Sequence, residues 1–302
     1  MIWFKNLMIY RLTSPLSLQA DELESQLQQE KFHPCQQNEM SKFGWSNPLA
    51  TSDFLHFNVG QQFLLIAHKE EKILPATVVK KETENRIETL EQKEQRKLKK
   101  TEKQAIKDDV VEMLLPRAFS KHQFTSIWLD LERQLVYVDA GSAKRAEDSL
   151  ALLRKTLGSL PVVPISFAKQ PIDAMTEWLT KGETPAWLNL LEEAELKSFD
   201  TDSVIRCKRQ DLESDEIAIH LNAGKFVTKL ALEWENHFSF VLNEDGTLAR
   251  LKFADEVREK NDDILKEDIA QRFDADFVLM TEEVRLFVEK LTEALGGVQA
   301  RI

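Results

Sequence analysis

The stretch from Pro75 to Pro116 constrains the fold of this chain more than any other part of the sequence. It contains no glycine and no aromatic residue, and it is rich in Glu, Lys, Gln and Arg. Strong helix formers without internal breakers predict helix. The capping-box pattern Thr101-x-x-Gln104 predicts that the helix is broken, or capped again, near Thr101.

Apolar residues are distributed unevenly along this stretch. They are sparse in its first half and more frequent between Ile106 and Leu114. Because a helix packs through the face that carries its apolar residues, we expect the pair to project from the body and to attach through its later end. The sequence therefore predicts an inserted helical arm over residues 75–116.

Strand patterns flank the predicted arm on both sides. Residues 54–72 predict two strands joined at Gly60, and residues 124–141 predict a hairpin. We therefore expect an N-terminal α+β unit that consists of residues 1–74 and 117–169, with the arm inserted between its two parts.

A second α+β unit is predicted over residues 170–302. It begins with a helix, and it ends with a helix that Gly296 and Gly297 terminate. The turn Asn243–Gly246 joins two of its strands. Its strands are expected near residues 203–210, 225–234, 237–242 and 247–253. The predicted fold class is α+β, with mixed or antiparallel sheets.

Composition is that of a globular protein with a real core. The chain has 302 residues, of which 42% are hydrophobic and 30% charged. Its apolar runs are too short to span a bilayer, and its first residues predict a strand and not a signal peptide. Cys35 and Cys207 are the only cysteines, so neither a disulfide framework nor a multi-cysteine metal site is indicated. We expect a cytoplasmic protein that contacts no membrane.

Positive charge is concentrated within the predicted arm. The formal net charge of the chain is -11, yet residues 93–107 hold seven basic and two acidic residues. The local sum of +5 leaves -16 for all other residues. Lysines recur there at spacings of three or four, so a continuous helix would carry them along one face of about 21 Å. Such a row matches the spacing of phosphates along a duplex. The alternative is an ordinary solvated helix face.

Two further basic groups lie on predicted strands. Arg206, Lys208 and Gln210 would share one face of the first strand, and Arg250 and Lys252 one face of the second. Each strand alone is also compatible with a solvated sheet face. No aromatic residue is interleaved with the basic residues at 93–107, which favours contact with duplex backbone over stacking on single strands.

Catalytic motifs are absent from the sequence. It has no P-loop, G-x-G-x-x-G, H-E-x-x-H or G-x-S-x-G pattern. One alternative is a Mg²⁺-dependent nuclease in which Asp53 and Glu70 hold the metal and Lys72 assists the attacking water. The simpler interpretation is a charged strand end. We expect no catalytic residue, no metal site and no cofactor.

Several long, irregular strings together resemble one family, the bacterial recombination-associated protein RdgC. The strings extend from near the N-terminus to about residue 281, so the resemblance covers almost the whole chain. They are WFKNLMIYRL, KEEKILP, RKLKKTEK, LLPRAFS, SLALLRKTLGSLPVVP, AGKFVTKLALEW and QRFDADFVLMT.

The resemblance implies a homodimer that closes into a ring around double-stranded DNA and binds it largely without regard to sequence. It also implies association with the nucleoid and restraint of RecA, with no enzymatic activity and no cofactor. Phe119 corresponds to a phenylalanine that contributes to one of the family's two dimer contacts. Arg209 and Gln210 fall where the family has residues that affect DNA binding, although the family position of Arg209 carries lysine, which bonds differently.

The sequence therefore predicts a nonspecific duplex-binding dimer, with RecA as a possible direct partner. The rival hypotheses are the nuclease and an adaptor whose basic arm holds an acidic protein. The predicted DNA-binding residues are Arg96, Lys97, Lys99, Lys100, Lys103, Arg117, Lys208, Arg209, Gln210, Arg250 and Lys252.

Overall fold

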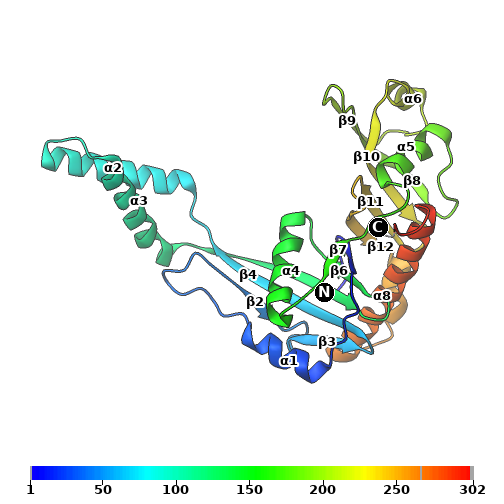
Figure 1. The fold of residues 1–302 in the computed structure, drawn as a ribbon, viewed down its shortest axis with the longest axis horizontal. Coiled ribbons are helices and arrows are strands. Elements are labelled where there is room, and N and C mark those ends of the chain that lie inside the picture. Colours follow the sequence, from blue (N-terminus) through cyan, green and yellow to red (C-terminus); the bar gives the residue numbers. More distant parts are fainter. Residues whose placement is uncertain (1, 266, 300–302) are drawn as a thin grey trace.

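Two antiparallel sheets organise the chain. The structure, a computed structural model, describes residues 2–265 and 267–299, and within them it contains two sheets and eight α-helices. This confirms the predicted α+β class. Figure 1 shows a bent molecule with a helical hairpin at one end, the first sheet in the middle and the second sheet at the other end.

The first sheet has seven strands in the order β2-β4-β5-β6-β1-β7, with β3 also paired to β4. Every pairing between these strands is antiparallel, and β4 pairs with β5 over eleven residues. The strands are β1 (Met8–Leu12), β2 (Ser41–Ser46), β3 (His56–Val59), β4 (Gln62–Lys72), β5 (Ser120–Asp130), β6 (Leu135–Val138) and β7 (Val162–Pro164).

Both faces of the first sheet are buried along the second half of β5, whereas the first half of that strand, beside the arm, is exposed or half-buried. Ile127 and Leu129 of β5 face one core, which the helices α1 (Ala20–Gln29) and α4 (Ala143–Leu157) cover. Trp128, which lies between them, faces the other core together with residues of the second unit. The period of two along a strand sends successive side chains to opposite faces, so β5 contributes to both cores.

The second sheet has five strands in the order β12-β11-β10-β8-β9. Its helices α5 and α8 pack against one face, and Figure 1 shows no helix over the other face. The strands are β8 (Asn189–Lys197), β9 (Val204–Lys208), β10 (Phe226–Trp234), β11 (Phe238–Asn243) and β12 (Leu248–Phe253). The helices are α5 (Pro171–Lys181), α6 (Asp215–Asn222), α7 (Asp255–Arg258) and α8 (Ile269–Ala294), with a 3-10 turn η2 (Glu259–Asn261).

Sequence patterns missed three elements of the fold and misjudged two others. Strands β2 and β8 and helix α6 were not predicted. In β8 three glutamates occur among the apolar residues and mask the strand pattern. Strand β9 ends at Lys208, two residues earlier than expected. The first strand begins at Met8, because the preceding residues pair with the second sheet, where Leu7 and Leu248 exchange backbone hydrogen bonds.

The stretch between β4 and β5 forms a helical hairpin. It consists of α2 (Ala76–Glu94), α3 (Lys100–Leu114) and the 3-10 turn η1 (Leu115–Arg117). Figure 1 shows the hairpin joined to the rest of the chain where β4 ends and β5 begins. The predicted break is present, but the predicted capping box is wrong. Thr101 lies inside the first turn of α3, and the Glu102 carboxylate accepts a hydrogen bond from the Lys99 backbone N–H at 2.7 Å.

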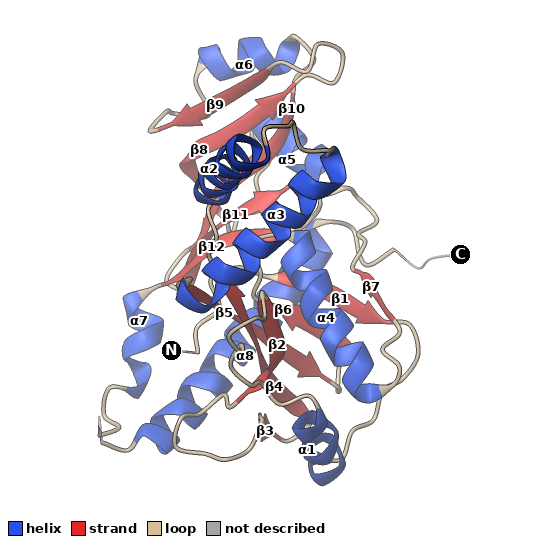
Figure 2. Ribbon diagram, turned by 90° about the vertical axis from the view of Figure 1, so that its left-hand side faces the viewer, coloured by secondary structure: helices blue, strands red, loops and turns tan. Residues whose placement is uncertain are grey.

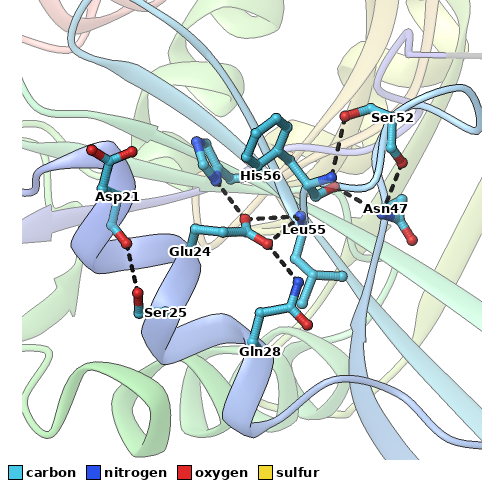
Figure 3. Close-up of polar contacts among 9 residues, drawn as sticks. Asp21, Glu24, Ser25, Gln28, Asn47, Ser52, Leu55 and His56 are labelled. Carbon is cyan, nitrogen blue, oxygen red and sulfur yellow. Dashed lines mark hydrogen bonds and ion pairs between the residues drawn. The ribbon is translucent and has the colours of Figure 1, made fainter.

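A carboxylate on α1 fixes the loop between β2 and β3 (Figure 3). Glu24 accepts hydrogen bonds from the Leu55 backbone N–H at 2.9 Å and from Gln28 at 2.7 Å, and its other contact is His56 Nδ1 at 2.8 Å. The Asn47 amide donates to the carbonyls of Ser52 and Phe54 within the same loop. These bonds satisfy backbone groups that no strand pairs.

A buried ion pair joins the two sheets. The Arg285 guanidinium of α8 donates to the Asp130 carboxylate at the end of β5, from Nε at 2.7 Å and from Nη2 at 2.6 Å. Asp130 is fully buried, and Glu132 gives the same guanidinium a second carboxylate at 2.9 Å. The pair therefore fixes α8, and the second sheet that packs on it, relative to the first sheet.

Candidate nucleic-acid interface

The turn between α2 and α3 concentrates the basic residues of the arm. Gln95 ends α2 in the left-handed conformation, and Leu98, in the turn that follows, is buried. The Glu91 carboxylate accepts hydrogen bonds from Lys97 Nζ at 2.7 Å and from the Leu98 backbone N–H at 3.0 Å. These bonds hold the pKa of Glu91 at about 2, so the carboxylate stays charged and orders the turn.

The expected continuous lysine face is wrong. The chain reverses direction between α2 and α3, so the basic residues at 93–107 are divided between two antiparallel helices and their turn. Local acidic groups also pair with several of them. Arg96 contacts Glu94 and Glu102 at 2.7 Å each, and Lys97 and Lys103 both contact Glu91. In the part of the chain that the structure describes, Lys99 and Lys100 are exposed and form no ion pair.

The second and third basic groups of the sequence meet in one groove. Lys208 is the last residue of β9 and Arg209 follows it, whereas Arg250 and Lys252 belong to β12. Together they line a hollow of about 420 Å³ on the uncovered face of the second sheet. Glu192 and Glu193 of β8 line it as well, and Arg250 Nη2 contacts the Glu193 carboxylate at 2.9 Å. The sequence predicted the residues but gave no sign that they would meet.

Two arginines of this groove have an unusual backbone. Arg209 and Arg250 both have positive φ angles, of 52° and 54°. Residues other than glycine rarely have positive φ angles, and such a backbone conformation costs on the order of 1–3 kcal/mol. Arg250 lies where the pairing of β12 with β11 is irregular. Strained cationic residues that converge on one hollow are typical of a binding surface.

Gln210 and Arg206 do not join this groove. The side chain of Gln210 is half-buried and contacts Ser214 and Glu216 at 3.4 Å. It was expected on the same strand face as Lys208, but the backbone turns at Arg209, so the period of two no longer applies. Arg206 pairs with Glu195 at 2.8 Å.

The arm and the groove lie on opposite sides of an open space. In Figure 1 the hairpin α2–α3 and the second sheet occupy the two ends of the bent chain, and the uncovered face of that sheet is turned toward the hairpin. Figure 2, viewed from the arm side, has α2 and α3 in front of the same sheet. Both views therefore place two groups of basic residues across one concavity.

Arg117 and Phe119 lie where the arm joins the first sheet. Arg117 is exposed at the end of η1. The side chain of Phe119 is 84% exposed, which excludes it from the core, and its carbonyl accepts a hydrogen bond from the backbone N–H of Ile73. Ile73 is itself exposed, so the two residues form an apolar patch that water covers in a single chain.

The nuclease residues are not assembled as a metal site. Glu70 is buried, and its two carboxylate oxygens accept hydrogen bonds from Ser120 Oγ at 2.5 Å and the Cys35 backbone N–H at 2.7 Å. Those bonds lower the pKa of Glu70. Asp53 lies in the exposed loop before β3. Over residues 2–265 and 267–299, no three His, Cys, Asp or Glu side chains are grouped to hold a metal ion.

Comparison with known proteins decides the family. A family model described as "Putative exonuclease, RdgC" matches residues 2–298. Proteins named recombination-associated protein RdgC align over 100% of both chains. They are 78% identical in Actinobacillus pleuropneumoniae serotype 3 (strain JL03), 67% in Pasteurella multocida (strain Pm70) and 62% in Haemophilus influenzae (strain ATCC 51907 / DSM 11121 / KW20 / Rd).

The chain belongs to the RdgC family. The resemblance found in the sequence is thereby confirmed, and with it an association with recombination. Two of the RdgC strings belong to the arm and its root: RKLKKTEK includes the turn of the arm, and LLPRAFS leads from the arm into β5. Among the residues of this RdgC chain that the structure describes, no helix is both long and apolar enough to cross a membrane.

Sequence reasoning missed the acidic residues that organise these surfaces. Glu91 orders the turn of the arm, and Glu193 holds Arg250 over the groove. Glu91 precedes Lys97 by six residues and Glu193 comes from another strand, so neither pair follows a helical or strand period. Only the reversal of the chain in the arm and the order of strands in the sheet bring them together.

Proposed function

We propose that this chain binds double-stranded DNA without sequence preference, as a homodimer that encircles the duplex. The observation that carries the proposal is the placement of two basic surfaces across one concavity. One is the turn of the arm, with Lys97, Lys99 and Lys100, and the other is the groove of the second sheet. An otherwise acidic surface would keep phosphate away from the remaining parts of the chain.

The ion pairs around the basic residues are compatible with this function. Lys97 and Arg250 are largely exposed, and exposed ion pairs contribute only about 0–1 kcal/mol. Phosphate can therefore replace the carboxylate partner at little cost. In the absence of DNA the carboxylates hold these long side chains in place, which reduces the entropy lost on binding.

Two apolar patches support a closed dimer. One consists of Ile73 and Phe119 beside the arm. The other lies at the far end of the second sheet, where Phe199 and Phe226 contact each other and Ile219 is exposed. Figure 1 places α6 and β9 at the opposite end of the chain from the arm. In a two-fold dimer that used both patches, the two chains would form two separate contacts and enclose a hole between them.

Association with the nucleoid in the cytoplasm follows from such binding. A ring that occupies the duplex would keep RecA from the DNA that strand exchange needs, and this would restrain recombination without chemistry, cofactor or direct contact with RecA. The adaptor hypothesis differs because it requires the basic arm to bind an acidic protein in the absence of DNA.

A salt titration tests the proposal. Each lost phosphate contact should reduce the slope of log affinity against log salt by about 0.9. Reversal of Lys97 and Lys100 to Glu should weaken binding to unrelated duplexes equally and flatten the slope, whereas Arg258→Glu on α7 should leave both unchanged, because Arg258 lies outside both basic surfaces. Fluorescence anisotropy with two duplexes measures this. A flat salt response of the wild-type protein would reject the mechanism.

Two inexpensive assays separate the rival functions. Incubation of the pure protein with plasmid and Mg²⁺ tests the nuclease, and nicking that Glu70→Gln abolishes would support it. Retention on a duplex column tests the adaptor, which should pass through the column and bind RecA without DNA. Sedimentation of Phe119→Ser beside Leu286→Ser tests the dimer: only the first variant should dissociate more readily, since Leu286 is exposed on α8 away from both patches.

A further inference from the structure

A cavity of about 370 Å³ lies between the two units of the chain, away from both basic surfaces. Helix α4 and strands β1 and β7 of the first unit form most of its wall, and the β11–β12 turn of the second unit closes it. Its volume is that of a small organic ligand and not of a single water molecule.

The floor of the cavity contains a polar group without a partner. Tyr10 is only 8% exposed, and in the described part of the chain its hydroxyl forms no hydrogen bond. Burial raises the pKa of Tyr10, and the nearby carboxylates of Glu147 and Asp245 raise it further, so the phenol is neutral and lies in a negative potential. Tyr10 is not among the residues whose side-chain polar atoms are fully buried and unpartnered, so its hydroxyl is accessible from the cavity and its oxygen can accept a hydrogen bond from a ligand.

The two carboxylates at the rim also have free acceptor sites. Glu147 forms no ion pair within residues 2–265 and 267–299. Asp245 uses Oδ1 to accept hydrogen bonds from the backbone N–H and the hydroxyl of Thr247, at 3.0 Å and 2.7 Å, which leaves its second oxygen unused. The cavity therefore offers three acceptors: two carboxylates and one phenolic oxygen. A primary ammonium group has three N–H donors and one positive charge, so it matches this set in number and in sign.

The rest of the wall is suited to an alkyl chain. Met8, Leu150 and Ile165 line it and are buried. Arg154 lines it too, seven residues after Glu147 on α4 and thus about 10.5 Å further along the helix. Its guanidinium would repel a second ammonium group at the far end of the ligand.

We propose that this cavity binds a small aliphatic molecule with one primary ammonium group. The ammonium donates to Glu147, Asp245 and Tyr10, and the methylenes cover the apolar wall. This site is independent of the proposed DNA binding. Because its wall comes from both units, an occupied cavity would stabilise their relative orientation.

Calorimetric titration of the full-length protein at pH 7 and low salt, without DNA, tests the site. Hexylammonium should bind saturably with one site per chain. Glu147→Gln should weaken it about tenfold, since a charged hydrogen bond is lost, and Tyr10→Phe about threefold. Asp148→Asn, the adjacent change on α4 outside the cavity, should bind as the wild type does.

Ligand analogues separate the ammonium from the alkyl chain. Hexanoate should not bind, and 1,6-diaminohexane should bind more weakly than hexylammonium because of Arg154. Unsaturable binding of hexylammonium, equal binding by Glu147→Gln, or equal binding of hexanoate would each overturn the proposal. Glu147 is exposed, so its variant should fold normally, and an unchanged thermal unfolding curve checks this.

Discussion

Removal of one partner from the Asp130–Arg285 pair should destabilise the joint between the sheets severely. Arg285→Met deletes both of its N–H donors to a fully buried carboxylate and leaves, among the residues that the structure describes, only the Arg133 backbone N–H, at 3.2 Å from Oδ1. An unpaired buried charge of this kind costs about 3–5 kcal/mol. The double variant Asp130→Asn with Arg285→Met leaves no buried charge between the sheets, since the remaining carboxylate of Glu132 is exposed, so it should recover most of the loss.

Urea unfolding followed by tryptophan fluorescence measures this cost, since the buried Trp128 lies in the same joint. A matched control exists in the neighbouring pair of Arg133 with Glu289, which is more exposed. Arg133→Met should cost no more than about 1 kcal/mol. If Arg285→Met were as mild as Arg133→Met, or if the double variant were as unstable as the single one, the argument from buried charge would be wrong.

Three further predictions concern the arm, the groove and the first sheet. Glu91→Gln should increase hydrogen exchange of the Leu98 backbone amide at pH 7. In the wild-type chain exchange of this amide should increase only as the pH falls below 4.5 toward about 2, because the Glu91 carboxylate that accepts its hydrogen bond must first be protonated. Arg209→Gly should raise the free energy of unfolding by about 1 kcal/mol, because glycine adopts a positive φ without strain, and it should also weaken DNA binding. Thermal unfolding measures the first effect and a gel shift the second. A variant that binds DNA as tightly as the wild type would contradict the role of Arg209. Burial lowers the pKa of His68, and His122 lowers it further, so the unfolded state takes up a proton more readily than the folded state. Stability should therefore fall as the pH drops below about 6.5. His68→Gln should reduce the decrease in melting temperature between pH 7.5 and 5.5, and an unchanged decrease would exclude His68 as its source.

Local patterns predicted the elements whose causes are local. Ser142 caps α4 by accepting a hydrogen bond from the Arg145 backbone N–H, and Gly158 ends that helix in the left-handed conformation, as the sequence indicates. The hairpin turns after β5 and β11 were predicted for the same reason. Strand β8 was not, because its glutamates are held by cations of other strands, as Glu195 is by Arg206 and Lys229.

The features of the candidate interface likewise fall into those with a local cause in the sequence and those that depend on tertiary contacts. The sequence alone determined which residues are basic, that the arm is helical and that the chain resembles the RdgC family, because these depend on residue identity and on spacing along one element. Only the tertiary structure decided that Lys208 and Arg209 meet Arg250 and Lys252, that the arm reverses at Gln95 and that Phe119 is exposed. These features depend on strand order and on how the two sheets pack, and contacts between residues distant in sequence leave no periodic trace along the chain.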